Sequence, residues 1–210
     1  MTRSLAILVA AAALYGFSIG ASHSWLYATR NLLKFPLLIL VTAAVCAVAY
    51  FVLARFLGAP LGFVTVQRLV LAVFRDAVVL LASLSPVVAW LACTMQRPLG
   101  RDLGDYPLFQ GLNVVAIAIS GCLAVRVQAR RLLAERGLRA ANRWLLLGSW
   151  MAVSLAVGGQ TAWYLRPFFG ATPLGDVTPP FCDGTAPDFR GARSFYEAVW
   201  NLVVPPAGWH

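Results

Sequence analysis

Five long apolar stretches constrain the fold of this chain more than any other feature. They cover residues 5–21, 35–53, 77–95, 109–125 and 144–165. A helix needs about 20 consecutive apolar residues to cross a hydrocarbon core roughly 30 Å thick. We therefore predict an all-α fold in which residues 1–165 form a transmembrane helical bundle of about five spans and residues 166–210 form an outer C-terminal tail.

The composition also favours a membrane protein, because 60% of the residues are hydrophobic and only 12% are charged. So few charged residues cannot cover the surface of a water-soluble globule. The net charge of +9 would suggest nucleic-acid binding in a soluble protein. Here the arginines cluster beside apolar stretches, where basic residues set topology and contact anionic lipid headgroups. We therefore expect a bilayer with anionic headgroups, and no nucleic acid, as the partner of these charges.

Basic residues are divided unequally between the two sides that five alternating spans define. One side carries ten of them with two carboxylates, and the other carries seven with six carboxylates. By the positive-inside rule the first side is cytoplasmic, so the N-terminus lies inside and the tail lies in the periplasm. Sixteen arginines against a single lysine suggest a GC-rich bacterium, and hence its inner membrane. The ten cytoplasmic residues are Arg3, Arg55, Arg68, Arg75, Arg126, Arg130, Arg131, Arg136, Arg139 and Arg143.

The first apolar stretch is either an uncleaved span or a signal peptide. Ser18 and Gly20 are small residues that would suit a cleavage site near its end. Small residues also recur every four positions, and such a row lets a second helix approach closely in lipid. This row favours an uncleaved span that packs against another helix, and its members are Ala12, Gly16, Gly20 and Ser24.

Two features are predicted before the middle of the chain, an interfacial helix at residues 65–74 and a kink at Pro86. Arg68 and Arg75 are seven residues apart and share one helical face, which suits an amphipathic helix lying in the membrane interface. The alternative is that this segment extends the following span inward. Within that span, Pro86 removes a backbone donor and predicts a kink, and Ser83 and Ser85 can satisfy the freed carbonyls.

The densest group of informative residues is GGQTAWYLRPFFG, residues 158–170, at the outer end of the last span. Paired glycines permit close packing, and a glutamine offers donors and an acceptor at the membrane edge. An arginine here either contacts lipid headgroups or pairs with a carboxylate of the tail, and the following proline stops the helix. The motif is therefore an interfacial anchor or an interaction site built from Gly158, Gly159, Gln160, Trp163, Arg166 and Pro167.

Four segments resemble an uncharacterised bacterial family of small polytopic inner-membrane proteins. They are PLLILVTAAVC from Pro36, SLSP at 83–86, GGQTAWYLRPFFG, and the FR pair ending at Arg190 followed by FYEAVW from Phe195. The match covers residues 16–200 and supplies no catalytic residue. Some members are described as actin-binding, which no residue here supports. The order of an interfacial helix, a proline-bearing span and five crossings is also similar to Yip-type membrane proteins, in topology only.

The remaining reactive side chains do not predict a metal site, a cofactor or an enzyme. The carboxylates are scattered, and Asp183, Asp188 and Arg190 are best interpreted as a solvated loop. His23 and His210 are isolated, and no CxxC pair is present. Cysteines within apolar stretches usually pack as small buried residues. Cys93 and Cys182 nevertheless fall on the same oxidising side, where they could form a disulfide.

We therefore expect a non-enzymatic integral membrane protein that acts as a structural or accessory subunit and associates with itself or with other membrane proteins. The alternative is a small oligomeric channel or transporter. Intramembrane ionisable residues mark most ion pathways, and none is expected at mid-span. A neutral pathway would be lined by uncharged polar residues, for which the candidates are Ser83, Ser85, Asn113, Ser120 and Gln160.

Overall fold

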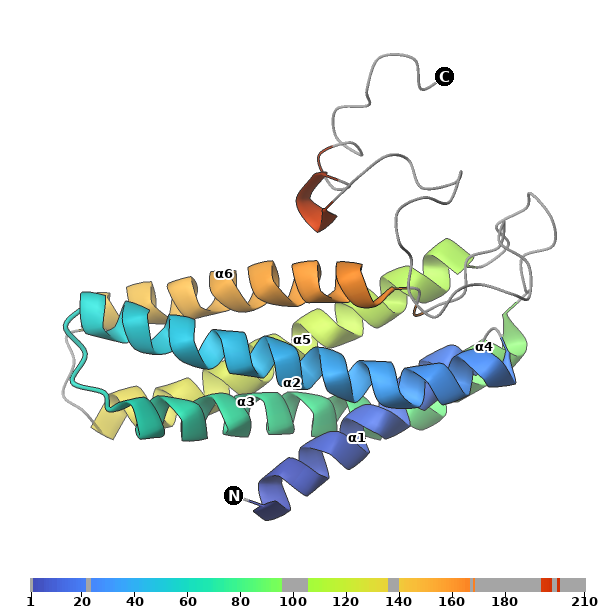
Figure 1. Ribbon diagram of the computed structural model, residues 1–210, viewed down its shortest axis with the longest axis horizontal. Helices are drawn as coiled ribbons and strands as arrows, with labels where there is room; N and C mark the ends of the chain where they lie inside the picture. Colours follow the sequence, from blue (N-terminus) through green and yellow to red (C-terminus); the bar gives the residue numbers. More distant parts are fainter. Residues whose placement is uncertain are drawn as a thin grey trace.

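The computed structural model describes residues 2–21, 24–95, 106–135, 140–166, 168, 194–197 and 200. Every element of regular structure within these ranges is helical, which confirms the all-α fold class for this part of the chain. The helices lie side by side in an elongated bundle (Figure 1). Their bounds are α1 Thr2–Gly20, α2 Trp25–Phe56, α3 Phe63–Ser83, α4 Ser85–Thr94, α5 Tyr106–Glu135 and α6 Ala140–Leu165.

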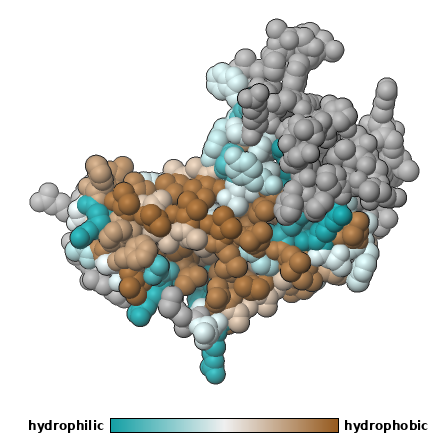
Figure 2. Space-filling model, in the orientation of Figure 1, coloured by the Kyte–Doolittle hydropathy of each residue, from teal (hydrophilic) through white to brown (hydrophobic). Residues whose placement is uncertain are grey.

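Within the described ranges, four helical segments are long and apolar enough to cross a membrane: Thr2–Gly20, Trp25–Phe56, Gly111–Gln128 and Trp144–Leu165. The pair formed by α3 and α4 makes a fifth candidate, bent by 44° at a short break. Figure 2 shows hydrophobic side chains covering much of the face of the bundle that is turned toward the viewer. These features support a membrane protein with four or five spans, and the value of five stays a prediction.

Helix α2 is much longer than the apolar stretch that predicted it. It begins at Trp25, because the Ser24 side chain caps it by accepting a hydrogen bond from the Tyr27 backbone N–H at 3.3 Å. Arg30 and Lys34, which precede the apolar stretch 35–53 in the sequence, therefore lie inside the helix. At 1.5 Å per residue, its 32 residues extend about 48 Å, well beyond the hydrocarbon thickness.

Residues 65–74 do not form a separate helix, since they are the first half of α3 and continue without a break to Ser83. The structure thus agrees with the second prediction, in which this segment extends the following span. Val66, Leu69 and Val70 are buried against α2, so the apolar face of this segment packs within the bundle. An amphipathic pattern is equally compatible with a helix on a bilayer and one packed on its neighbours.

The break expected near Pro86 occurs at Leu84, between α3 and α4. Pro86 stands in the first turn of α4, where a missing backbone N–H costs no hydrogen bond. Ser83 turns its hydroxyl back to donate to the Leu80 carbonyl at 2.6 Å. Proline therefore starts a new helix here rather than bending a continuous one.

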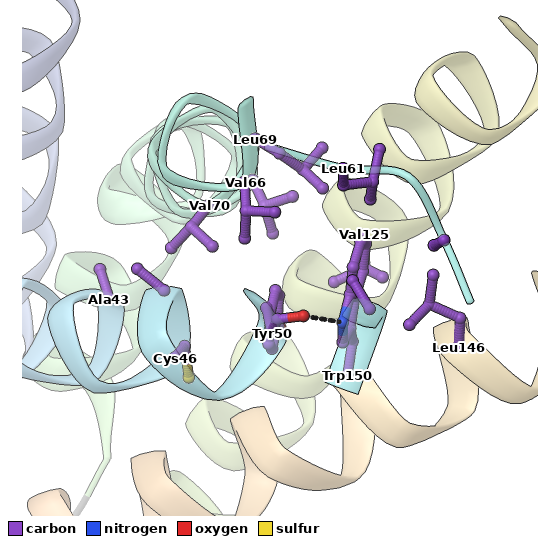
Figure 3. Packing of buried hydrophobic residues seen from close by; sticks show 14 of the residues in the cluster. Ala43, Cys46, Tyr50, Leu61, Val66, Leu69, Val70, Val125, Leu146 and Trp150 are labelled. Atoms are coloured by element: carbon purple, nitrogen blue, oxygen red, sulfur yellow. Dashed lines mark hydrogen bonds between the residues drawn. The ribbon is translucent and has the colours of Figure 1, made fainter. Parts of the chain in front are cut away.

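Two clusters of buried side chains hold the bundle together. The first joins α2, α3, α5 and α6 around the parallel rings of Tyr50 and Trp150, whose centroids are 4.7 Å apart (Figure 3). The second joins α1 to α2, α3, α4 and α5 around Tyr15 and Phe35. In this cluster the Tyr15 hydroxyl donates to Asn113 Oδ1 at 2.9 Å, which ties α1 to α5 inside the bundle.

Candidate functional site

The glycines of α1 lie where α1 and α2 approach most closely. A Cβ atom on Gly16 would stand 2.5 Å from the Asn31 carbonyl oxygen and 2.6 Å from the Phe35 Cβ. A Cβ atom on Gly20 would collide with the Tyr27 carbonyl oxygen and stand 2.6 Å from the Ala28 nitrogen. The row of small residues is thus occupied by the next helix of the same chain.

A buried polar pair lies on α2 near the same end of the bundle. Asn31 is fully buried and donates from Nδ2 to the Phe168 carbonyl oxygen at 2.5 Å. Lys34 is 6% exposed, and its Nζ lies 6.0 Å from the centroid of the Phe168 ring. The same ring meets Phe35 edge-on at 6.3 Å. Helix α2 therefore contacts Phe168, three positions beyond the end of α6 at Leu165.

Asn31 and Lys34 were not among the candidates that the sequence indicated. Their spacing of three residues places them on one helical face, next to Phe35. Hydropathy does not reveal this pair, because the apolar stretch begins only at Phe35 and both residues precede it. Recognising Ser24 as a helix cap would have placed them inside α2.

Arg166, the first residue after α6, has a partner on that helix. Its guanidinium carbon lies 3.4 Å from the centroid of the Trp163 ring, a stacked cation–π contact. This contact holds the Arg166 guanidinium against the Trp163 ring at the end of α6. Four tail carboxylates are expected as partners of this arginine. Asp176, Asp183 and Asp188 lie outside the described residues, as do Pro167 and Arg190, whereas Glu197 is exposed in the turn at residues 194–197. A bond between Arg166 and the tail therefore stays a prediction.

Gly159 and Gln160 contact a short turn near the C-terminus. The Gln160 side-chain oxygen accepts a hydrogen bond from the Phe195 backbone N–H at 3.2 Å. The Tyr196 hydroxyl donates to the Ala156 carbonyl oxygen. A Cβ atom on Gly159 would stand 2.8 Å from the Phe195 ring. Ala156, Gly159 and Gln160 of α6 thus contact the turn at residues 194–197. We call this contact the tail seat.

Gly158 lies on a different face of α6, toward α2. A Cβ atom there would meet the Thr42 methyl group at 3.7 Å, an ordinary van der Waals distance. The paired glycines therefore serve two contacts, one with α2 and one with the tail, and only Gly159 is tightly enclosed.

The polar residues that could line a pathway are mostly enclosed by neighbouring helices. Asn113, Ser120 and Ser85 are all at least 95% buried. Asn113 accepts from Tyr15 and donates to the Phe109 carbonyl oxygen at 2.8 Å, so both ends of its amide are used. Ser83 is exposed and bonds to its own helix. Gln160 binds the tail instead of a neighbouring span.

A charged cluster that the sequence did not indicate joins α1, α3 and α5. Arg75 donates to Asp76 Oδ1 from Nη2 at 2.6 Å and to the Ser4 hydroxyl at 3.5 Å. Gln128 donates to the second oxygen of Asp76. The Arg75 and Asp76 side chains are 32% and 29% exposed. The cluster fixes the relative positions of three helices, and residues far apart in sequence supply it.

The described residues include no group of three His, Cys, Asp or Glu side chains that could hold a metal ion. Cys46 is buried, as expected of a packing residue, but Cys93 and Cys122 are exposed on their helices. Cys93 is a free thiol in the structure, and its suggested partner Cys182 lies outside the described residues.

The described residues thus bring together two contacts near the end of α6, the tail seat and the Asn31–Phe168 bond, and both connect spans to the C-terminal part of the chain. The resemblance to a family of inner-membrane proteins stays a prediction. Comparisons of the chain with protein-family models, with curated proteins and with solved structures found no match.

Proposed function

We propose that this chain is a non-enzymatic integral membrane protein that works as a structural or accessory subunit of a membrane assembly. The observation that carries the proposal is the use of the buried polar groups. Both ends of the Asn113 amide are hydrogen-bonded, to Tyr15 and Phe109, and Tyr50 shares a hydrogen bond with Ser154. The bonds from Tyr15 to Asn113 and between Tyr50 and Ser154 join different helices, and they engage these groups within the protein.

An accessory subunit needs a surface for its partner, and α6 offers one. Gly148 and Ala152 are exposed and four residues apart, and a Cβ atom on Gly148 would meet nothing within 4 Å. Small residues at this spacing allow a helix of a second copy, or of another membrane protein, to approach closely. Co-purification from native membranes with a constant partner, and its loss in Gly148→Leu, would test the proposal. A wild-type protein that purifies alone and monomeric would contradict it.

The second candidate function is an oligomeric channel or transporter, and two buried polar atoms favour it. Within the described residues, Asn31 Oδ1 and Ser85 Oγ have no hydrogen-bond partner. Asn31 lies one helical turn from Lys34, a buried cation of the kind that marks ligand pathways. These groups would give a polar substrate places to bind.

Cysteine labelling separates the two functions. In a cysteine-free background, we expect Ser85→Cys and Ser120→Cys to resist a water-soluble thiol reagent in intact membranes, because both positions are at least 96% buried. Both should react fully after denaturation in SDS, which controls for the chemistry of the thiol. Rapid labelling of either residue before denaturation would indicate a water-filled path and favour the channel.

The proposed location is a bacterial inner membrane, with the N-terminus in the cytoplasm and the C-terminus in the periplasm. The asymmetry of basic residues supports this orientation. A reporter that is active only in the periplasm should be active after Gly208 and inactive within 130–140. Because the cytoplasmic assignment of 126–143 rests on its arginines, the reverse pattern would refute the charge argument.

A further inference from the structure

A short turn near the C-terminus lies along the side of α6 and not beyond its end. Residues 195–197 are helical, and the Ser194 hydroxyl accepts a hydrogen bond from the Glu197 backbone N–H at 3.1 Å. The turn contacts residues 156–160 of α6, which ends at Leu165. At 1.5 Å per residue, those contacts lie about 8–14 Å before the end of the helix. Figure 1 shows the turn, in red, over α6.

This position falls within the part of α6 that is apolar enough to cross a membrane. That segment, Trp144–Leu165, has 22 residues and extends about 33 Å, close to the thickness of the hydrocarbon core. Leu155 and Tyr164 are about two-thirds exposed on its surface. The turn is therefore seated beside a helix surface that faces lipid if α6 crosses the bilayer.

The hydrogen bonds of the tail seat suit a place without water. An unpaired backbone N–H in hydrocarbon is costly, so polar groups there must find partners in the protein. Gln160 provides the acceptor for the Phe195 N–H, and Ala156 provides one for the Tyr196 hydroxyl. The Phe195 ring fills the space that the missing side chain of Gly159 leaves.

The exposed side chains at and after the turn include residue types that anchor proteins at membrane interfaces. Tyr196 is 50% exposed and Trp200 is 64% exposed. Tyrosine and tryptophan rings prefer the level of the headgroups, where one edge is apolar and the other is hydrated. Glu197 is also exposed, and its charge is costly in the hydrocarbon centre. These side chains together fit the boundary between headgroups and acyl chains.

We propose that the turn at residues 194–197, together with Trp200, re-enters the outer leaflet and binds lipid at this boundary, held on α6 by the tail seat. Gly159 gives the Phe195 ring room, Gln160 satisfies the backbone, and Tyr196 and Trp200 contact the lipid. This role requires α6 to cross the bilayer, and it is independent of the accessory function proposed above.

Site-directed spin labelling in liposomes of phosphatidylethanolamine and phosphatidylglycerol tests the proposal. All four cysteines are replaced by alanine, and single labels are placed at Trp200→Cys, Leu155→Cys and Pro60→Cys. Leu155 is the lipid reference, and Pro60, exposed between α2 and α3, is the aqueous reference. Collision rates with oxygen, which concentrates in lipid, and with a water-soluble nickel chelate measure the surroundings. Because Leu155 lies near the middle of the span, we expect the ratio of the two rates at Trp200 to lie between the values at Leu155 and Pro60, as it should at the boundary.

A ratio at Trp200 equal to that at Pro60 would overturn the proposal while leaving the accessory function untouched. An aqueous signal at Leu155 would overturn the proposal together with the span in α6.

Glycine variants then test the tail seat itself. Gly159→Ala should displace the Phe195 ring and move the Trp200 signal toward the aqueous value. Gly158→Ala is the matched control and should leave it unchanged, because its Cβ has room beside Thr42. Identical signals in the two variants would refute the role of Gly159.

Discussion

Replacing Gly20 or Gly16 by alanine should destabilise the protein sharply, although alanine is the better helix former. Each new Cβ atom would enter the contact between α1 and α2 and press on backbone atoms of residues 27, 28 or 31, which cannot move aside as a side chain can. Overpacking of this kind typically costs about 1–3 kcal/mol. Leucine should cost more. Thermal unfolding in detergent measures the loss, and insertion into the membrane should be normal.

Gly148→Ala provides the control with the opposite expected sign. Gly148 also lies within a helix, but nothing lies within 4 Å of the position of its Cβ. The substitution should therefore show only the gain in helix propensity, roughly 0.5–1 kcal/mol. If Gly20→Ala and Gly16→Ala stabilised the protein as Gly148→Ala does, the close approach of α1 and α2 would be incorrect.

The sequence located most of the helices because hydropathy reports directly on the length of an apolar stretch. Residues 5–21 correspond to α1 and residues 144–165 end with α6 at Leu165. Hydropathy fails where a helix continues through polar residues, as α2 does between Trp25 and Lys34. It also cannot distinguish lipid from protein as the neighbour of an apolar face, which is why residues 65–74 were open to two interpretations.

The motif at 158–170 pointed to Gln160 as a residue with a hydrogen-bonding role, but its partner could not be deduced. Gln160 and Phe195 are 35 positions apart, and Asn31 and Phe168 are 137 positions apart. Such pairs depend on how the helices are ordered in space, which periodicity does not report. The two faces of the glycine pair also follow only from the packing, since Gly158 and Gly159 are equivalent in composition.

Truncating Trp150 to alanine should release much of the contact between α2 and α6. Its ring is 1% exposed and lies parallel to that of Tyr50, within 5°. Its Nε1 donates to the Tyr50 carbonyl oxygen at 3.3 Å, as Figure 3 shows. Removing so large a buried side chain typically costs about 3–5 kcal/mol. Unfolding in a graded series of SDS concentrations would measure this loss.

Two variants divide the effect of Trp150 into its parts. Trp150→Phe keeps a ring for stacking but loses the N–H donor, so it should cost about 0.5–1.5 kcal/mol. Trp144→Ala removes an identical side chain from the same helix at a position that is 68% exposed, and should change stability little. Because α6 also carries the tail seat, Trp150→Ala should loosen the turn at 194–197 through movement of the helix, whereas Trp144→Ala should not. Equal losses of stability in the two alanine variants would mean that Trp150 does not pack against α2.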